Sequence, residues 1–101
     1  MEQVTDYEFE WDDAKAAINL QKHGVNFMDA ISVFTDPLMM TRYDDEHNDE
    51  EDRWISLGFA VKNQLLVLVH TFVERGQHSA LVRIISARLA TRQEREQYGG
   101  H

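Results

Sequence analysis

The first third of the chain shows a strand-like and then a helix-like pattern of hydrophobic residues. The segment from Tyr7 to Trp11 alternates aromatic and acidic residues, and this period of two predicts a short strand with one buried face. Good helix formers follow from Ala14 to Lys22, where Asp12 is placed to cap the helix and Gly24 to end it. A strand and then a helix are therefore predicted.

A second helix and several strands are predicted in the rest of the chain. Apolar residues recur at helical spacing after Asn26, a candidate helix cap, and Asp36-Pro37 is expected to end this helix. Four further segments have the composition of strands: Leu38–Tyr43, Arg53–Val61, Leu65–Val73 and Leu81–Ala87. The segment Leu65–Val69 is apolar at both parities, so we expect its strand to be central and covered on both faces.

Short connections and a capping motif complete the predicted fold. Residues 62–64 and 74–79 are short enough for hairpins, which make neighbouring strands antiparallel. Thr91 and Glu94 have the spacing of a capping box, which opens a last short helix through Tyr98. The expected fold is α+β, an antiparallel sheet of about four strands packed against two N-terminal helices, with a short C-terminal helix, in one domain over residues 1–101.

Composition narrows the possible functions mainly by exclusion. The chain has no cysteine, which excludes a disulfide scaffold, a thiolate zinc site and a cysteine nucleophile. No apolar run is long enough to cross a membrane, and the start of the sequence lacks the basic and apolar regions of a signal peptide. We therefore expect a soluble, cytoplasmic protein with no membrane partner.

Charge is distributed unevenly along the chain, whose formal net charge is −8. Residues 1–52 hold 15 of the 18 acidic side chains, whereas residues 53–101 hold 7 of the 10 lysines and arginines. This asymmetry indicates an acidic contact surface and a separate basic one. The densest acidic run, Asp44–Asp52, is expected to be a solvated loop; with His47 it could also bind a cation, but it lacks the spacing of a calcium loop.

Basic residues near strand ends are the candidates for chemistry. Arg83 stands in an otherwise apolar strand segment, so its guanidinium either pairs with an acid or binds an anion such as phosphate. Arg88 and Arg53 lie at predicted strand ends, which are good platforms for sites. Lys22 and His23 end the first helix, where a histidine either contacts the last carbonyls or serves as a general acid or base. His70 is expected to be a hydrogen-bonded core residue.

Two groups of motifs, taken in order, resemble the BrnT toxin family. The first is Phe9-x-Trp11-Asp12-x-x-Lys15-x-x-x-Asn19-x-x-Lys22-His23-Gly24-Val25-x-Phe27-x-x-Ala30. The second comprises Phe34-x-Asp36-Pro37, Arg53-Trp54-x-x-x-Gly58, Arg83-Ile84-Ile85-Ser86-Ala87-Arg88 and Ala90-Thr91-x-x-Glu94. Together they span nearly the whole chain, from Phe9 to Tyr98.

This resemblance implies a RelE-like ribonuclease toxin of a type II toxin-antitoxin system. Such a toxin cleaves RNA without a metal or other cofactor and halts translation. Its implied partner is a BrnA-like antitoxin with a ribbon-helix-helix-type DNA-binding region. Operator DNA would be bound only through that antitoxin, and the complex could contain a dimer. By the same resemblance, Lys22 and His23 become the leading acid-base candidates, and the phosphate-binding set becomes Arg53, Arg83 and Arg88.

The sequence departs from the family pattern in three places. Leu89 stands where a lysine usually follows Ser-Ala-Arg, His70 stands where a tyrosine is common, and the run from Asp44 to Asp52 is unusually acidic. These departures keep a second hypothesis open, in which the chain is a toxin homologue without strong catalysis that acts as a binding module in a repressor complex. A third hypothesis is a cation-binding regulatory domain that uses the acidic run.

Overall fold

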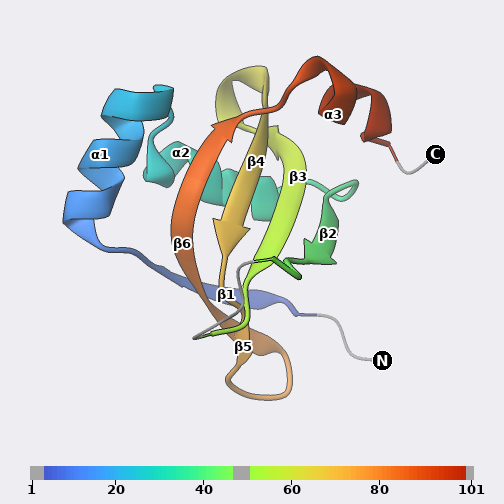
Figure 1. Cartoon of the computed structure of the whole chain (residues 1–101). Coiled ribbons are helices and arrows are strands. Elements are labelled where there is room, and N and C mark those ends of the chain that lie inside the picture. The colour runs from blue at the N-terminus through green and yellow to red at the C-terminus, as the bar shows by residue number, and fades with distance from the viewer. Residues whose placement is uncertain (1–3, 47–50, 100–101) are drawn as a thin grey trace.

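The structure is a computed structural model, and it describes residues 4–46 and 51–99. Figure 1 shows the elements, whose order along the chain is β1 (Asp6–Glu10), α1 (Asp13–His23), α2 (Phe27–Ala30), the 3-10 helix η1 (Ile31–Thr35), β2 (Met40–Tyr43), β3 (Trp54–Ala60), the 3-10 turn η2 (Val61–Asn63), β4 (Gln64–His70), β5 (Val73–Glu74), β6 (Ser79–Leu89) and α3 (Arg92–Gln97). The α+β class predicted from the sequence is therefore confirmed.

The sheet differs from the predicted one in strand number and direction. Within the described residues it has six strands in the order β1-β6-β4-β3-β2, and β5 pairs with β6 off this path. β1 runs parallel to β6, whereas the other neighbours are antiparallel. The prediction of an antiparallel sheet of about four strands is thus wrong, because β1 joins the sheet beside a strand that is distant in sequence. Local patterns identify a strand but do not reveal such a partner.

Both predicted N-terminal helices form where their caps lie. The Asp12 carboxylate accepts a hydrogen bond from the Lys15 backbone N–H (3.0 Å), and Gly24 ends α1 in the left-handed conformation (φ 70°). The Asn26 side chain caps α2 by accepting from the Met28 N–H (2.7 Å). The helix then continues to Thr35 as η1, so its extent is confirmed although its second half is a 3-10 helix.

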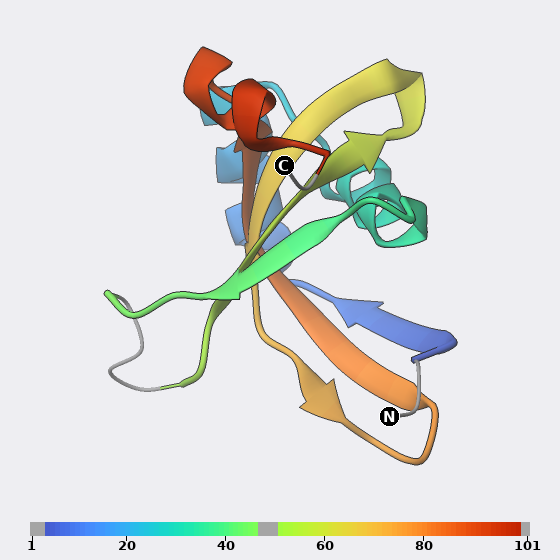
Figure 2. The same ribbon diagram turned by 90° about the vertical axis from the view of Figure 1, so that its right-hand side faces the viewer.

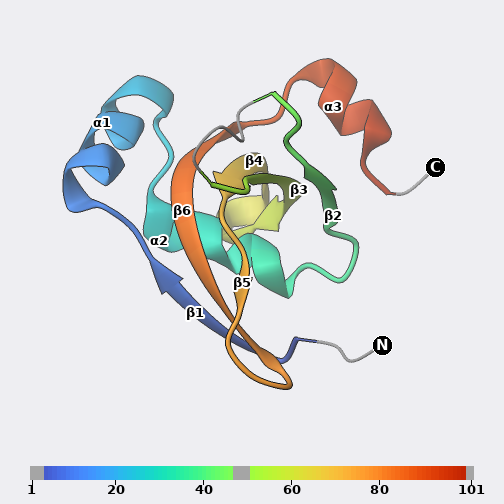
Figure 3. The same ribbon diagram turned by 60° about the horizontal axis from the view of Figure 1, so that its bottom comes forward.

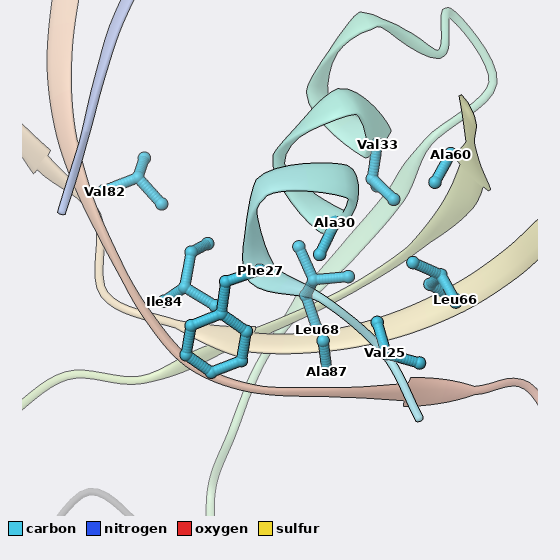
Figure 4. Close-up of a cluster of buried hydrophobic side chains, with 10 residues drawn as sticks. All are labelled: Val25, Phe27, Ala30, Val33, Ala60, Leu66, Leu68, Val82, Ile84 and Ala87. Atoms are coloured by element: carbon cyan, nitrogen blue, oxygen red, sulfur yellow. The ribbon is translucent and has the colours of Figure 1, made fainter. Parts of the chain in front are cut away.

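The core confirms that β4 is central and covered on both faces. Leu66 and Leu68 pack in a cluster with residues of α2, η1 and β6, drawn in Figure 4. Leu65 and Val67 point to the opposite face, where Ala90 and Tyr98 pack against them. Because side chains alternate along a strand, β4 contributes to two separate hydrophobic clusters.

The helices occupy different sides of this sheet. In Figure 2, α2 and η1 lie on one side of β3 and β4, and α3 lies on the other. α1 lies beside β6, at the margin opposite to α3 (Figures 1 and 3). Asn19 of α1 hydrogen-bonds both backbone groups of Ala87, donating to its carbonyl (2.9 Å) and accepting from its N–H (3.1 Å). α1 thereby covers the edge of β6 beyond the point where β1 ends.

Asp36 fixes the C-terminal helix beside the sheet. Its carboxylate accepts a hydrogen bond from the Phe59 backbone N–H (2.8 Å) at the end of β3. The hydroxyl of Tyr98, directly after α3, donates to the same carboxylate oxygen. The Tyr98 ring also packs edge-on against the Phe59 ring. These contacts hold α3 over one end of the sheet face that lies opposite α2 and η1.

Candidate functional site

Four arginines share the sheet face that lies opposite α2 and η1, and we call it the arginine face. Arg42 alternates with Thr41 and Tyr43 on β2, and Arg53 directly precedes Trp54 at the start of β3. On β6, Arg83 lies between Val82 and Ile84, which point into the core under α2 and η1. The face therefore carries Arg42, Arg53, Arg83 and Arg88.

A β-bulge in β6 brings Arg83 and Arg88 to the same face. Positions 83 and 88 are an odd number of residues apart, so in a regular strand these side chains would point to opposite faces. In β6, Ser86 pairs with Val69 and Ile84 pairs with His70, which leaves one extra residue between them. This insertion restores the alignment, because a bulge reverses the alternation beyond it.

Arg53 and Arg83 meet at one carboxylate. Glu51 binds the Arg83 guanidinium through Oε2, and its Oε1 lies 3.7 Å from Nη2 of Arg53. The Arg83 backbone is fixed on both sides by Thr71, whose N–H donates to the Arg83 carbonyl (3.0 Å). Within residues 4–46 and 51–99, the buried Nε of Arg53 has no hydrogen-bond partner. A single anion thus bridges two arginines.

Arg88 forms a separate, two-pronged ion pair with Glu94 of α3. Its Nη1 and Nη2 donate to Oε1 (2.8 Å) and Oε2 (2.9 Å) of that carboxylate. The hydrogen bonds from Arg88 are the main cause that lowers the pKa of Glu94 to about 2, and in return they raise the pKa of Arg88. Glu94 also completes the predicted capping box with Thr91, which is confirmed.

The arginines therefore form two groups. Because of the bulge, the positions opposite Arg83 and Arg88 are Thr71 and Val67, which are four residues apart; at ~3.3 Å per residue, the two arginine backbones are about 13 Å apart. Both guanidinium groups remain accessible, since each of the two side chains is 40% exposed. Adjacent phosphates of a single strand lie closer together than this, so the two arginines suit non-adjacent phosphates of an extended strand rather than one shared phosphate.

Lys22 and His23 lie in the exposed last turn of α1. They follow Asn19 by three and four residues, so they share its side of the helix, the side that docks on β6 beside Ala87. α1 and β6 end at the same end of the molecule (Figure 1). The two residues thus lie near the Arg88 end of β6, and no described hydrogen bond or ion pair links them to the arginines.

His70 belongs to the opposite face and is a hydrogen-bonded core residue, as predicted. It is 1% exposed, and its Nδ1 donates to the Thr71 carbonyl (2.9 Å), so its Nε2 accepts from the Ser56 hydroxyl (2.7 Å). Burial lowers the pKa of His70 and favours the neutral ring. This departure from the family pattern therefore does not touch the arginine face.

The acidic run is only partly the solvated loop that the sequence predicts. Asp45, Glu46 and Asp52 are exposed, but Asp44 is buried and Glu51 binds arginines. Residues 47–50, with the cation candidate His47, lie outside the described residues. Elsewhere, the described ranges contain no group of three His, Asp or Glu side chains arranged to hold a metal ion. They also contain no helix of the length and apolarity needed to cross a membrane.

Sequence reasoning missed three residues of this face. The local pattern places Glu51 in an acidic run and Glu94 in a helix cap. It does not mark Arg42 as a site residue. The spacing of Arg88 and Glu94, which face each other across the turn between β6 and α3, was a usable signal. The contact between Glu51 and Arg83 joins distant parts of the chain, so no local sequence signal indicates it.

Comparison with known proteins identifies the family. Residues 11–94 match the family model described as the ribonuclease toxin BrnT of type II toxin-antitoxin systems. The chain belongs to the BrnT family. The resemblance carried by the Lys-His-Gly-Val and Arg-Ile-Ile-Ser-Ala-Arg signatures is thereby confirmed. All the candidate residues named from the sequence lie within the matched range.

A BrnT crystal structure supports the fold. The chain is similar to the Brucella abortus ribonuclease toxin BrnT, with a TM-score of 0.56 and 20% sequence identity over 87% of this chain and 100% of that chain. At this identity, the likeness establishes a shared BrnT fold. A search of curated proteins found no match.

Proposed function

We propose that this BrnT-family chain is an endoribonuclease that cleaves RNA on its arginine face without a metal ion and so inhibits translation. The observation that carries the proposal is the bulge in β6, which aligns Arg83 with Arg88 and faces both toward the side of Arg53. Arginine forks suit phosphate oxygens in geometry and in charge. An extended RNA strand can therefore lie along β6 with its phosphates on these guanidinium groups.

The proposed reaction uses the 2′-hydroxyl of the RNA as its nucleophile. This oxygen loses its proton to a base and attacks the adjacent phosphorus, while the 5′-oxygen leaves and takes up a proton. The products are a 2′,3′-cyclic phosphate end and a 5′-hydroxyl end. Lys22 and His23 are proposed to transfer these protons, because an amine and an imidazole can each accept and donate a proton. Arg53, Arg83 and Arg88 stabilise the extra negative charge on the phosphorane.

Glu51 and Glu94 hold the guanidinium groups in place before RNA binds. Each carboxylate accepts the same kind of charge-assisted hydrogen bond that a phosphate oxygen would accept. An incoming phosphate is therefore proposed to replace Glu51 between Arg53 and Arg83. No further cofactor is required by this scheme.

The proposed partner is a BrnA-like antitoxin with a ribbon-helix-helix-type DNA-binding region. Family membership implies an antitoxin, and the net charge of −8 suits a partner with basic segments. We propose that the antitoxin masks the arginine face and brings toxin copies together as a dimer. In this cytoplasmic complex, the antitoxin makes the contacts with operator DNA. The single domain would have the RelE-like arrangement.

One observation favours a second function, that of a binding module without catalysis. Glu51 and Glu94 already neutralise Arg83 and Arg88, and Leu89 supplies no charge beside them. If RNA phosphates can neither displace Glu51 from Arg53 and Arg83 nor share Arg88 with Glu94, the chain would serve only to complete a repressor complex with its antitoxin.

Cleavage in the presence of a strong chelator tests the proposal. The folded protein, free of antitoxin and supplied with ribosomes in a parallel reaction, should cleave RNA and leave cyclic phosphate or 3′-phosphate ends. Cleavage that stops with chelator and returns with magnesium would reject the metal-free mechanism. If neither reaction cleaves RNA while the protein still binds its antitoxin, the binding-module function is the correct one.

A further inference from the structure

A small cavity lies on the arginine face between α3 and the strands β2, β3 and β4. Its volume is about 150 Å³, and its floor is formed by Met40, Ile55, Leu57 and Val67. Arg42 lines one side, and Glu94 and Gln97 of α3 line another. The reaction proposed above assigns no role to this space.

The cavity adjoins the arginine that would hold an RNA phosphate. Arg88 pairs with Val67, Val67 with Leu57 and Leu57 with Met40, so these residues form one row across the sheet. Arg42 and Ile55 pair in the neighbouring row. An RNA strand whose phosphate lies on Arg88 therefore places an adjacent base beside the cavity.

The size and floor of the cavity suit one flat ring. A cavity of about 150 Å³ is the size that accepts a benzene ring in an apolar protein interior. The apolar floor can contact a ring face, while Arg42 at the rim can stack on it as arginines do on bases. A single pyrimidine ring thus fits this space.

The rim discriminates between the two pyrimidines through Glu94. Among residues 4–46 and 51–99, its carboxylate accepts hydrogen bonds from Arg88 and from the Thr91 N–H at Oε1, and from Arg88 alone at Oε2. Oε2 therefore keeps a free lone pair. An ionised carboxylate accepts from the exocyclic amino group of cytosine, as in base recognition elsewhere, and repels the corresponding carbonyl of uracil. Gln97 can supply both a donor and an acceptor to the rest of the ring edge.

We infer that this cavity binds one cytosine base of the RNA strand and that Glu94 selects it over uracil by accepting a hydrogen bond from its amino group. The inference deepens the proposed function, because it requires RNA to lie on the arginine face. Arg88 then serves two purposes, since it binds the neighbouring phosphate and orients the carboxylate that reads the base.

Titration with nucleotides tests the cavity independently of cleavage. Cytidine 3′-monophosphate added to the protein should shift the methyl NMR signals of Met40, Ile55 and Leu57, and should bind roughly tenfold more tightly than uridine 3′-monophosphate. Equal binding of the two nucleotides, tighter binding of adenosine 3′-monophosphate, or no shift of these methyl signals would each overturn the inference. If the cavity binds cytidine nucleotide but RNA is never cleaved, only the proposed catalysis fails.

A matched pair of variants isolates Glu94. Glu94→Gln keeps the size of the side chain but replaces its acceptor-only edge with an amide, so the preference for cytidine over uridine nucleotide should fall to about onefold. Glu96→Gln makes the same chemical change at an exposed position of α3 that does not line the cavity, and should keep the preference of the unmodified protein. A Glu94→Gln protein that still prefers cytidine nucleotide, or a Glu96→Gln protein that loses the preference, would contradict the assignment.

Discussion

Under η1, Ser56 and His70 are buried and neutral, whereas on the arginine face Arg83 and Arg88 are charged and accessible. Ser56 is fully buried, and its hydroxyl donates to the His70 ring while accepting from the Thr41 hydroxyl (2.8 Å). Arg83 and Arg88 are held instead by the partly exposed carboxylates of Glu51 and Glu94. A hydrogen-bond chain without free donors stabilises a fold, while accessible charge pairs keep their capacity for ligands.

The contrast follows from the alternation of side chains along each strand. Ser56 and Leu57 are neighbours in sequence, yet one bonds to His70 and the other lines the cavity on the arginine face. Each strand can therefore devote one face to packing and the other to ligands. Substitutions on the two faces should consequently affect different measurements.

The largest effect is expected from a core truncation on the helix-covered face. Leu68 is fully buried in the cluster with α2 and η1, so Leu68→Ala should lower the free energy of unfolding by about 2–5 kcal/mol. Leu89→Ala is the matched control, because Leu89 is 48% exposed and should change stability by less than about 0.5 kcal/mol. Urea unfolding measures both, and equal losses would show that this core does not carry the stability.

The arginine face should respond in activity more than in stability. Arg83→Ala and Arg88→Ala should each lower the cleavage rate by about 10²-fold, because each removes a preorganised charge that stabilises the transition state. Their melting temperatures should change little, since both ion pairs are half-exposed. Arg75→Ala, on the exposed turn after β5, is the control and should retain full activity.

Thermal melts recorded beside cleavage rates decide the roles of these arginines. If both variants melt far below the unmodified protein while their folded fraction cleaves RNA at the normal rate, the arginines belong to the scaffold. The active site would then lie elsewhere on the molecule.

A polar substitution under η1 should have the reverse effect. Ser56→Ala leaves the acceptor nitrogen of the buried His70 without its donor, which should cost about 1–3 kcal/mol of stability. The cleavage rate of the folded fraction should remain unchanged. Thr35→Ala gives a matched loss of an exposed hydroxyl and should have little effect on stability. A large fall in activity with Ser56→Ala would connect the two faces.

The sequence predicts interactions between neighbouring residues, but not contacts between segments that are distant in the chain. The cap at Asp12 and the capping box at Thr91 rest on neighbouring residues and are confirmed, and the predicted burial of Leu65–Val69 is confirmed for residues 65–68, while Val69 is partly exposed. The parallel partner of β1 depends on a contact between distant segments and was not predicted.

The candidate site shows the same limit. The sequence marks Arg53, Arg83 and Arg88 as candidates because their charges stand at strand ends or among apolar residues. The sheet does place them on one face. That face depends on a bulge opposite Val69 and His70, which only the pairing with β4 defines. The Glu51 partner likewise comes from a segment whose local pattern predicts nothing but solvation.

The smallest predicted effect is an acid dependence carried by the Arg88–Glu94 pair. The hydrogen bonds from Arg88 lower the pKa of Glu94 from 4.5 to about 2 in the folded protein. A carboxyl with a lowered folded pKa stabilises the fold above its unfolded pKa, and this contribution is lost as pH falls from about 4.5 to 2. Because the pair is partly exposed, we expect it to contribute only about 1 kcal/mol.

Urea unfolding between pH 6 and 3 tests this contribution. The loss of stability on acidification should be smaller in Arg88→Ala than in the unmodified protein, whereas Arg83→Ala should keep the original loss of stability because it leaves this pair intact. Equal acid dependence in all three proteins would show that the pair stabilises only the orientation of Glu94 and not the fold.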